Sequence, residues 1–239
     1  MQVDNYIALS SQMALRSRLD VLANNLANAS TPGFKSMHMV FSEYLSKQPS
    51  GPSLSYVRDA GTYRDTSQGP LSSTGNPLDL ALQGDGYFEV QTPQGIRYTR
   101  NGQLQLDQAG NVVTSQGYPV LNDGAAPLNL PPGATAITVN PDGTVSSSQG
   151  SAGHIAVVTF ADPGQLVLEG AGLYSSQAQP VPATSTTVAQ GMVEGSNVQP
   201  VIELTQLMRL SDQFTLNMTM LNDESSREKA AISQLGQVP

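Results

Sequence analysis

The feature that most constrains the fold is a run of positions near the C-terminus at which spacings of three and four residues alternate without a break. The run consists of Leu204, Leu207, Ser211, Phe214, Met218, Leu221, Ser225, Glu228, Ile232 and Leu235. Such spacing places every member on one face of an α-helix, as in the seam of a coiled coil. Ser196 or Asn197 can cap this helix, and Pro200 suits its first turn. The pattern therefore predicts a long amphipathic helix from about residue 196 to the C-terminus.

A second stripe of leucines lies near the N-terminus. It consists of Leu15, Leu19, Leu22 and Leu26, at spacings of 4, 3 and 4. The predicted helix contains Asn24, Asn25 and Asn28, although Asn is a poor helix former, and it ends at Thr31-Pro32-Gly33. Polar groups beside a helix seam fix register and partner number. Asn25 and Asn28 therefore favour a helix that packs in one specified register among copies of the chain.

The middle of the chain, from residue 35 to about residue 190, is rich in Gly, Pro, Ser, Thr, Asn and Asp. Strands are predicted at 78–82, 87–92, 96–100, 104–107, 111–115, 118–121 and 154–160, and PDGT at 141–144 is a hairpin signal. Residues 175–190 have the composition of a linker. Short strands at regular spacing, punctuated by glycine turns, predict an all-β sandwich or a barrel-like domain.

The predicted fold class is therefore a mainly β central domain with N- and C-terminal α-helices that pair as a coiled coil. The predicted domains are an N-terminal helix at 1–34, an extended connector with a hairpin at 35–70, a β-rich body at 71–190 and a C-terminal helix at 191–239. Each helix alone would be marginal in water, so the seams also imply a partner surface. The predicted assembly contacts are Leu15, Leu19, Leu22, Asn25, Leu26, Asn28, Leu204, Leu207, Phe214, Met218 and Leu221.

Composition argues against several classes of function. The net charge is −8, so the basic footprint of a nucleic-acid-binding protein is missing. The chain has no cysteine, which excludes disulfides and thiolate chemistry. No stretch approaches the length of a membrane span, and no cleavable signal peptide is expected.

Catalytic and metal-binding patterns are equally weak. The chain has two histidines, His38 and His154, in different zones and away from acidic clusters, so we expect no metal site. Residues 84–86, GDG, join two strands, so we interpret them as a turn and not as a phosphate loop. The paired carboxylates that a glycosidase needs could come from Asp79, Asp85, Glu89 and Asp107, but Asp is common in turns for backbone reasons. We therefore expect no catalytic residues, no cofactor and no enzyme activity.

The segment LANNLANASTPGFK (22–35) closely resembles the N-terminal signature of the flagellar rod, hook and hook-associated protein family. The matching residues are Asn25, Ala27, Asn28, Thr31, Gly33, Phe34 and Lys35. Residues 75–120 are similar to the β-domain motif of that family, and VEGSNVQPVIELTQLM (193–208) is similar to the start of its C-terminal helix. Three motifs in the family's order make the resemblance specific.

The resemblance implies a structural subunit of the bacterial flagellar basal body. Such a subunit would be exported unfolded through the flagellar type III apparatus and would polymerise in the periplasm with itself and with other rod proteins. The product is the rod, a drive shaft that transmits torque from motor to hook, with terminal helices in its inner layer and β domains outside. Within the family the chain most resembles the F-type proximal rod subunit, and the distal rod subunit is the near alternative.

Two readings from other classes remain open at this point. One is a secreted β-rich adhesin or fibre protein, which would need no matching pair of terminal seams. The other is an enzyme on the β domain, for which a carboxylate pair inside a cleft would be the supporting observation.

Overall fold

The computed structural model describes residues 2–46, 54–131, 133–134 and 136–235. The chain divides by its internal contacts into two units. The first, which we call the helical unit, comprises Met1–Ala27, Met37–Arg64 and Gln199–Pro239. The second, which we call the β body, comprises Asn28–Ser36 and Asp65–Val198. The mainly β middle and the two terminal helices confirm the predicted fold class.

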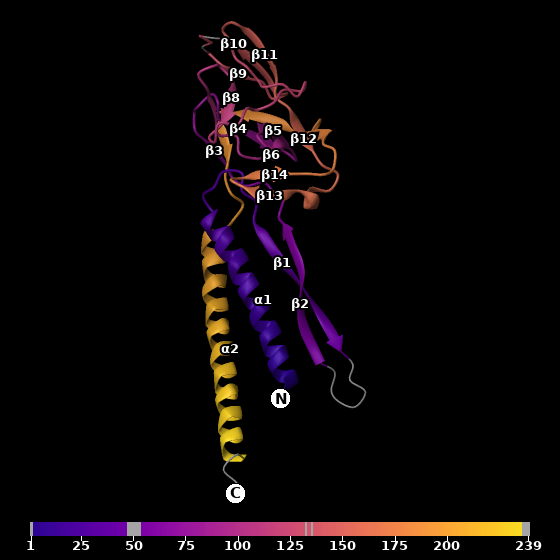
Figure 1. Ribbon diagram of the computed structural model, residues 1–239. Helices are drawn as coiled ribbons and strands as arrows, with labels where there is room; N and C mark the ends of the chain where they lie inside the picture. The colour runs from indigo at the N-terminus through magenta and orange to yellow at the C-terminus, as the bar shows by residue number, and fades with distance from the viewer. Residues whose placement is uncertain (1, 47–53, 132, 135, 236–239) are drawn as a thin grey trace. The chain divides into compact units, whose positions relative to one another are not determined.

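The helical unit contains two helices and one hairpin. Helix α1 (Gln2–Ala27) packs against helix α2 (Pro200–Leu235), and it also contacts the hairpin of β1 (Met37–Ser46) and β2 (Leu54–Arg64) (Figure 1). The hairpin register shifts between Val40 and Phe41, opposite Gly61, whose φ of 117° favours glycine. The segment predicted as a connector, 35–70, thus contains a long antiparallel hairpin that belongs with the helices.

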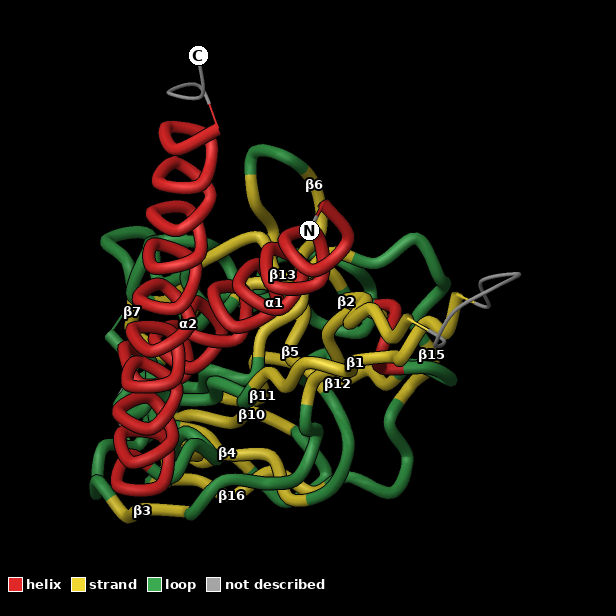
Figure 2. Tube along the Cα trace, turned by 90° about the horizontal axis from the view of Figure 1, so that it is seen from below, coloured by secondary structure: helices red, strands yellow, loops and turns green. Residues whose placement is uncertain are grey.

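The β body is built around an antiparallel sheet of six strands in the order β13-β14-β6-β5-β12-β15. Its strands are drawn in yellow in Figure 2. Its strands are β5 (Tyr87–Thr92), β6 (Gly95–Thr99), β12 (Val157–Thr159), β13 (Val167–Gly170), β14 (Leu173–Ser175) and β15 (Val181–Pro182). The 3₁₀ turn η1 (Pro163–Gln165) precedes β13. The predicted strand at 87–92 is confirmed residue for residue, and that at 96–100 is displaced by one position.

Shorter sheets complete the β body. They pair β3 (Leu71–Ser73) with β17 (Met192–Glu194), β4 (Leu80–Gln83) with β16 (Thr187–Gln190), and β7 (Leu104–Leu106) with β8 (Val112–Thr114). A further sheet has the order β11 (Gly150–His154), β10 (Thr144–Ser147), β9 (Thr138–Val139). The linker predicted at 175–190 is wrong, because this segment supplies β15 and β16, and Val188 in β16 is buried.

Two apolar clusters hold the β body together, and β5 contributes to both because its side chains alternate between faces. Phe88 and Val90 belong to the larger, aliphatic cluster, whereas Tyr87 belongs to a smaller aromatic one. In the aromatic cluster the rings of Tyr98 and Phe160 pack edge to face, with their centroids 4.8 Å apart. These clusters give the β body a core that is independent of the helices.

Candidate assembly surface and the clamp that supports it

The predicted contacts on α1 are largely turned inward. Leu22 is buried, and Leu15, Leu19 and Leu26 are partly buried. Asn25 is fully buried, and its amide makes two hydrogen bonds to Met37 at the start of β1. Its Nδ2 donates to the Met37 carbonyl at 2.8 Å, and its Oδ1 accepts from the Met37 N–H at 2.9 Å. Asn25 therefore fixes the register of α1 against the hairpin within the subunit.

Asn28 has a different role, because it lies just beyond the end of α1. Its carbonyl accepts a hydrogen bond from the Thr31 N–H at 3.1 Å, and its Oδ1 accepts from the Thr31 hydroxyl at 3.2 Å. Gly33 follows with a φ of 69°, which favours glycine, and an added Cβ there would lie 2.6 Å from the Arg100 carbonyl carbon. The sequence stop at Thr31-Pro32-Gly33 is thus a tight turn with a close backbone approach.

On α2 the predicted seam is divided between two faces. The face buried or partly buried in the subunit comprises Glu203, Leu207, Leu210, Phe214, Asn217, Leu221, Glu224 and Glu228, and we call it the inner stripe. Four members of the predicted seam belong to this stripe, namely Leu207, Phe214, Leu221 and Glu228, and Ser225 of the seam is also partly buried. Leu204 and Met218 are exposed, although Met218 also contacts Gln12 on α1. Leu210, which is buried, was missed by the sequence reasoning.

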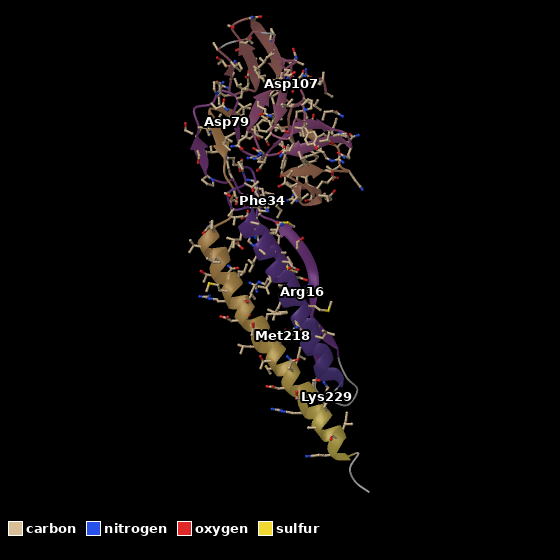
Figure 3. All side chains as sticks on the ribbon, turned by 60° about the vertical axis from the view of Figure 1, so that its left-hand side comes forward. Arg16, Phe34, Asp79, Asp107, Met218 and Lys229 are labelled. Atoms are coloured by element: carbon tan, nitrogen blue, oxygen red, sulfur yellow. The ribbon has the colours of Figure 1, made fainter. Side chains whose placement is uncertain are left out.

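A second surface of α2 is apolar although it faces solvent, and we call it the outer face. It consists of Val201, Ile202, Leu204, Met208, Leu216 and Met220. Met208, Leu216 and Met220 are 61%, 65% and 70% exposed (Figure 3 shows the side chains along this helix). Exposed apolar patches are typical of interaction surfaces, so this face is the candidate assembly surface.

The hydroxyl groups of α2 make this face less polar than its sequence indicates. Thr205, Thr215, Thr219 and Ser226 each donate a hydrogen bond to the carbonyl four residues earlier, at 2.7, 2.9, 3.0 and 2.8 Å. Because the hydroxyl protons are used within the helix, the threonine methyl groups become part of the outer face. Thr residues interspersed with exposed apolar residues along the helix are the sequence signal that could have indicated this.

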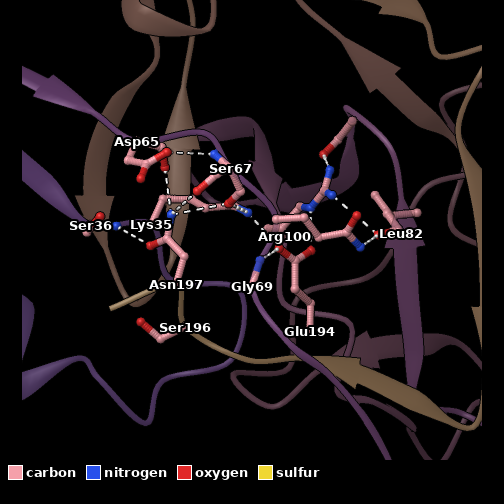
Figure 4. Close-up of polar contacts among 12 residues, drawn as sticks. Lys35, Ser36, Asp65, Ser67, Gly69, Leu82, Arg100, Glu194, Ser196 and Asn197 are labelled. Atoms are coloured by element: carbon pink, nitrogen blue, oxygen red, sulfur yellow. Dashed lines mark hydrogen bonds and ion pairs between the residues drawn. The ribbon is translucent and has the colours of Figure 1, made fainter. Parts of the chain in front are cut away.

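The segments that lead out of α1 and into α2 are clamped together inside the β body by a buried ion triad (Figure 4). Glu194 accepts from Lys35 Nζ at 2.6 Å, from Arg100 Nε at 2.7 Å and from the Gly69 N–H at 3.0 Å. Burial opposes ionisation of Glu194, but Arg100 and Lys35 outweigh it and hold the pKa of this carboxyl below its usual value. Burial lowers the pKa of Lys35, against the attraction of Glu194.

Asn197 completes the clamp with hydrogen bonds to two other chain segments, residues 34–36 and 65–67. Its Oδ1 accepts from the Ser36 N–H at 2.7 Å, and its Nδ2 donates to the carbonyls of Asp65 and Ser67 at 3.0 and 3.2 Å. Its own N–H donates to the Phe34 carbonyl. The β-body ends of the crossings to α1, β1, β2 and α2 are therefore bonded to one another.

Arg100 extends the clamp to the turn between β4 and β5. Its guanidinium donates to the carbonyls of Leu82, Gly84 and Gly86. The predicted turn at 84–86 is confirmed, and it is held by an arginine fork. No sequence pattern pointed to Lys35, Arg100 and Glu194 as partners, because they lie far apart in the chain.

Two of the four carboxylates considered for catalysis have structural explanations. Asp107 accepts hydrogen bonds from the N–H groups of Ala109 and Asn111, as in an Asx turn, and Asp79 accepts from Asn76. Among the described residues, no group of three or more His, Asp or Glu could hold a metal ion. Within the same part of the chain, neither helix is both long and apolar enough to cross a membrane.

The chain has two terminal helices, an apolar outer face on α2 and a β body whose connecting segments are bonded together. These features are typical of a structural protein that builds assemblies. Three family models match in the order of these parts. "Flagella basal body rod protein" covers residues 6–35, "Flagellar hook protein FlgE/F/G D1 domain" covers 81–147, and "Flagellar basal body rod FlgEFG protein C-terminal" covers 189–235.

Relatives match over almost the whole chain. The flagellar basal-body rod protein FlgF of Caulobacter vibrioides is 38% identical, with 98% of each chain covered, and FlgF of Mesorhizobium japonicum is 36% identical, with 99% of each covered. FlgG of Bacillus subtilis is 32% identical, with 93% of this chain and 96% of the relative covered. The chain therefore belongs to the family of flagellar hook and basal-body rod proteins, as a structural subunit of the basal-body rod. The predicted resemblance is confirmed.

Proposed function

We propose that this chain is a proximal rod subunit that polymerises in the periplasm through its helical unit, with itself and with other rod proteins. Export through the flagellar type III apparatus belongs to the same proposal, and so does transmission of torque from motor to hook. F-type relatives at up to 38% identity support the proximal position, with the distal position as the alternative.

The observation that carries the assembly proposal is the outer face of α2. Leu216 and Met220 would cost free energy on an isolated surface, and burying apolar area against a neighbour contributes about 25 cal/mol per Å². The inner stripe is already used within the subunit. Two of the predicted contacts on α2 would then touch neighbouring subunits, namely Leu204 and Met218. The other predicted contacts would shape the helix pair within the subunit, namely Leu15, Leu19, Leu22, Asn25, Leu26, Asn28, Leu207, Phe214 and Leu221.

The clamp fits a torque-bearing part. A rod must resist twisting, and contacts that repeat without closing on themselves build a helical tube. Glu194 and Asn197 bond to one another the segments through which the chain enters and leaves the β body, so a force transmitted along any of these segments acts on these hydrogen bonds and ion pairs. We infer that this bonding keeps the crossings from sliding independently under load.

The test is assembly in the source bacterium with Leu216→Asp. The change places a charge on the outer face and leaves the inner stripe intact, so the purified monomer should unfold like the wild type. Hook–basal bodies should be absent or lack this chain by mass spectrometry, and swimming should be lost. Gln213→Asp introduces the same residue at an exposed polar position one turn away, and it should assemble. Normal rods containing Leu216→Asp would refute the assignment of the outer face.

A further inference from the structure

A cavity of about 500 Å³ opens in the β body beside β12. Its polar lining comes from Glu89, Asp123, Asp142 and His154. Its apolar lining includes Val157, Val158, Pro182 and Val188. Carboxylates therefore meet an apolar wall, an arrangement that suits a cation on a hydrocarbon stem.

Glu89 is the unusual member of this lining. It is only 9% exposed, yet its carboxylate has no hydrogen bond or ion pair with any described residue. Only its backbone is bonded, to Ala156 and Leu121. Burial raises the pKa of Glu89, and the nearby charge of Asp123 raises it further. A carboxylate on a largely buried side chain is costly without a counter-charge, and Glu89 has none, whereas Glu194 has two cations.

His154 does not supply the missing positive charge, because its ring is held by other groups. Its Nδ1 lies 2.9 Å from Asp123 Oδ2, and its Nε2 contacts the Asp142 carbonyl oxygen. Tyr98, which pairs with Glu89 across β5 and β6, adds no positive charge. The groups that face Glu89 are therefore acidic, neutral or already engaged.

The β body has no other cation to offer. Its sequence contains ten acidic and three basic residues, a net charge of −7, whereas the helical unit contains nine acidic and eight basic residues, a net charge of −1. Lys35 and Arg100 are bound to Glu194, and Arg97 is bound to Glu169 at 2.5 Å. Among the described residues of the β body, every basic side chain is thus committed elsewhere.

We propose that the Glu89 cavity is a socket for one basic side chain, a lysine ammonium or an arginine guanidinium, from a neighbouring protein subunit. The methylene stem would lie along Val157 and Val158, and the charged end would meet Glu89. The socket adds a contact through the β body to the assembly through helices. That the donor is a neighbouring subunit rests on the proposed rod function, whereas the preference for a cation does not.

The first experiment titrates the purified full chain with N-acetyl-arginine methylamide and N-acetyl-lysine methylamide, followed by amide NMR. Shifts should appear at Ala156, Val157, Thr184 and Thr186, and the neutral N-acetyl-glutamine methylamide should not cause them. Glu89→Gln keeps the shape and removes the charge, so it should weaken cation binding about tenfold or more. Asp85→Asn removes an exposed charge outside the cavity lining, and it should bind like the wild type.

The socket is refuted if the neutral analogue binds as well as the cations, or if Glu89→Gln binds like the wild type. The second experiment compares the salt concentration at which hook–basal bodies release this chain. Glu89→Gln should release it at lower salt than Asp85→Asn and the wild type. If cations bind in solution but release is unchanged, the neighbour as donor is refuted. If the wild-type chain is absent from hook–basal bodies, the rod function fails while the titration still tests the socket.

Discussion

The ion triad at Glu194 allows a sharp test of the clamp. Glu194→Gln keeps the size of the side chain and removes the charge that Lys35 and Arg100 share. Both cations are almost fully buried, with side-chain exposures of 3% and 5%. In Glu194→Gln the two cations would remain in the protein interior without a counter-charge. Loss of one partner of a buried ion pair lowers the unfolding free energy for this reason.

The magnitude follows from burial. Removing one partner of a buried ion pair costs about 3–5 kcal/mol of unfolding free energy. Glu169→Gln is the matched control, because it breaks a second Arg–Glu pair in the same β body with the same substitution. Glu169 is 40% exposed and Glu194 is 0% exposed. Loss of the exposed pair should therefore cost much less unfolding free energy than loss of the buried triad.

The assay is urea unfolding of the full chain, followed by near-ultraviolet circular dichroism of the packed tyrosines in the aromatic cluster. Glu194→Gln should lower the midpoint several times more than Glu169→Gln does. The pKa of Glu194 is depressed in the folded state, so its stabilisation is complete above its usual pKa of 4.5 and is lost as pH falls through the folded pKa. The difference in unfolding free energy between Glu194→Gln and the wild type should therefore become smaller at acidic pH. Equal losses for both variants at neutral pH would refute the triad as the clamp.

Three further predictions concern single contacts. Asn25→Ala leaves the N–H and the carbonyl of Met37 without their side-chain partner, so it should lower the unfolding free energy by about 2–4 kcal/mol and speed amide exchange in α1 and β1. The control Asp20→Ala removes an exposed side chain of α1 and should change little, and amides that stay protected in Asn25→Ala would contradict this role. Gly69→Ala would place its Cβ 2.1 Å from the Gly195 carbonyl oxygen, so it should lower the unfolding free energy by at least about 1–3 kcal/mol in thermal unfolding. Gly195→Ala would make only ordinary contacts and should be tolerated, and similar melting temperatures for the two variants would show that the backbone can move to accept the new Cβ. Glu89→Gln should raise the unfolding free energy at neutral pH, because a carboxyl whose pKa is raised in the folded state destabilises the protein above that pKa. This gain in unfolding free energy should disappear as the pH falls through the folded-state pKa of Glu89, and a gain that does not depend on pH would point to packing instead.

The fold was predictable where interactions are local. The strands at 87–92 and 96–100 and the turn at 84–86 follow from alternation and glycine placement, and the structure has them there. The segment 175–190 was misjudged because β15 and β16 are only two and four residues long and depend on pairing with β12 and β4. Strands this short have too few residues to show a period, so only their partners define them.

The candidate site was predictable in part. The leucine stripes located both helices, but a spacing of three and four can be satisfied by two overlapping faces of α2. The predicted seam and the inner stripe share the positions Leu207, Phe214, Leu221 and Glu228. They differ at the positions between these, where the prediction has Ser211 and the structure instead buries the preceding residue, Leu210. Periodicity defines a helix and its approximate apolar side, whereas the packing partner decides which residues that side buries.

The sequence by itself determined the order of the parts, namely helix, β body and helix, because each is encoded in the spacing of neighbouring residues. It also determined the stop after α1, since Pro32 disfavours a helical backbone at the residue before it and Gly33 readily adopts the positive φ of the turn. Only the tertiary structure decided that Lys35 and Arg100 share Glu194, and that Glu89 is buried without a cation. Burial and charge pairing depend on segments far apart in the chain, and the free energy of an ion changes with surroundings that local sequence does not specify.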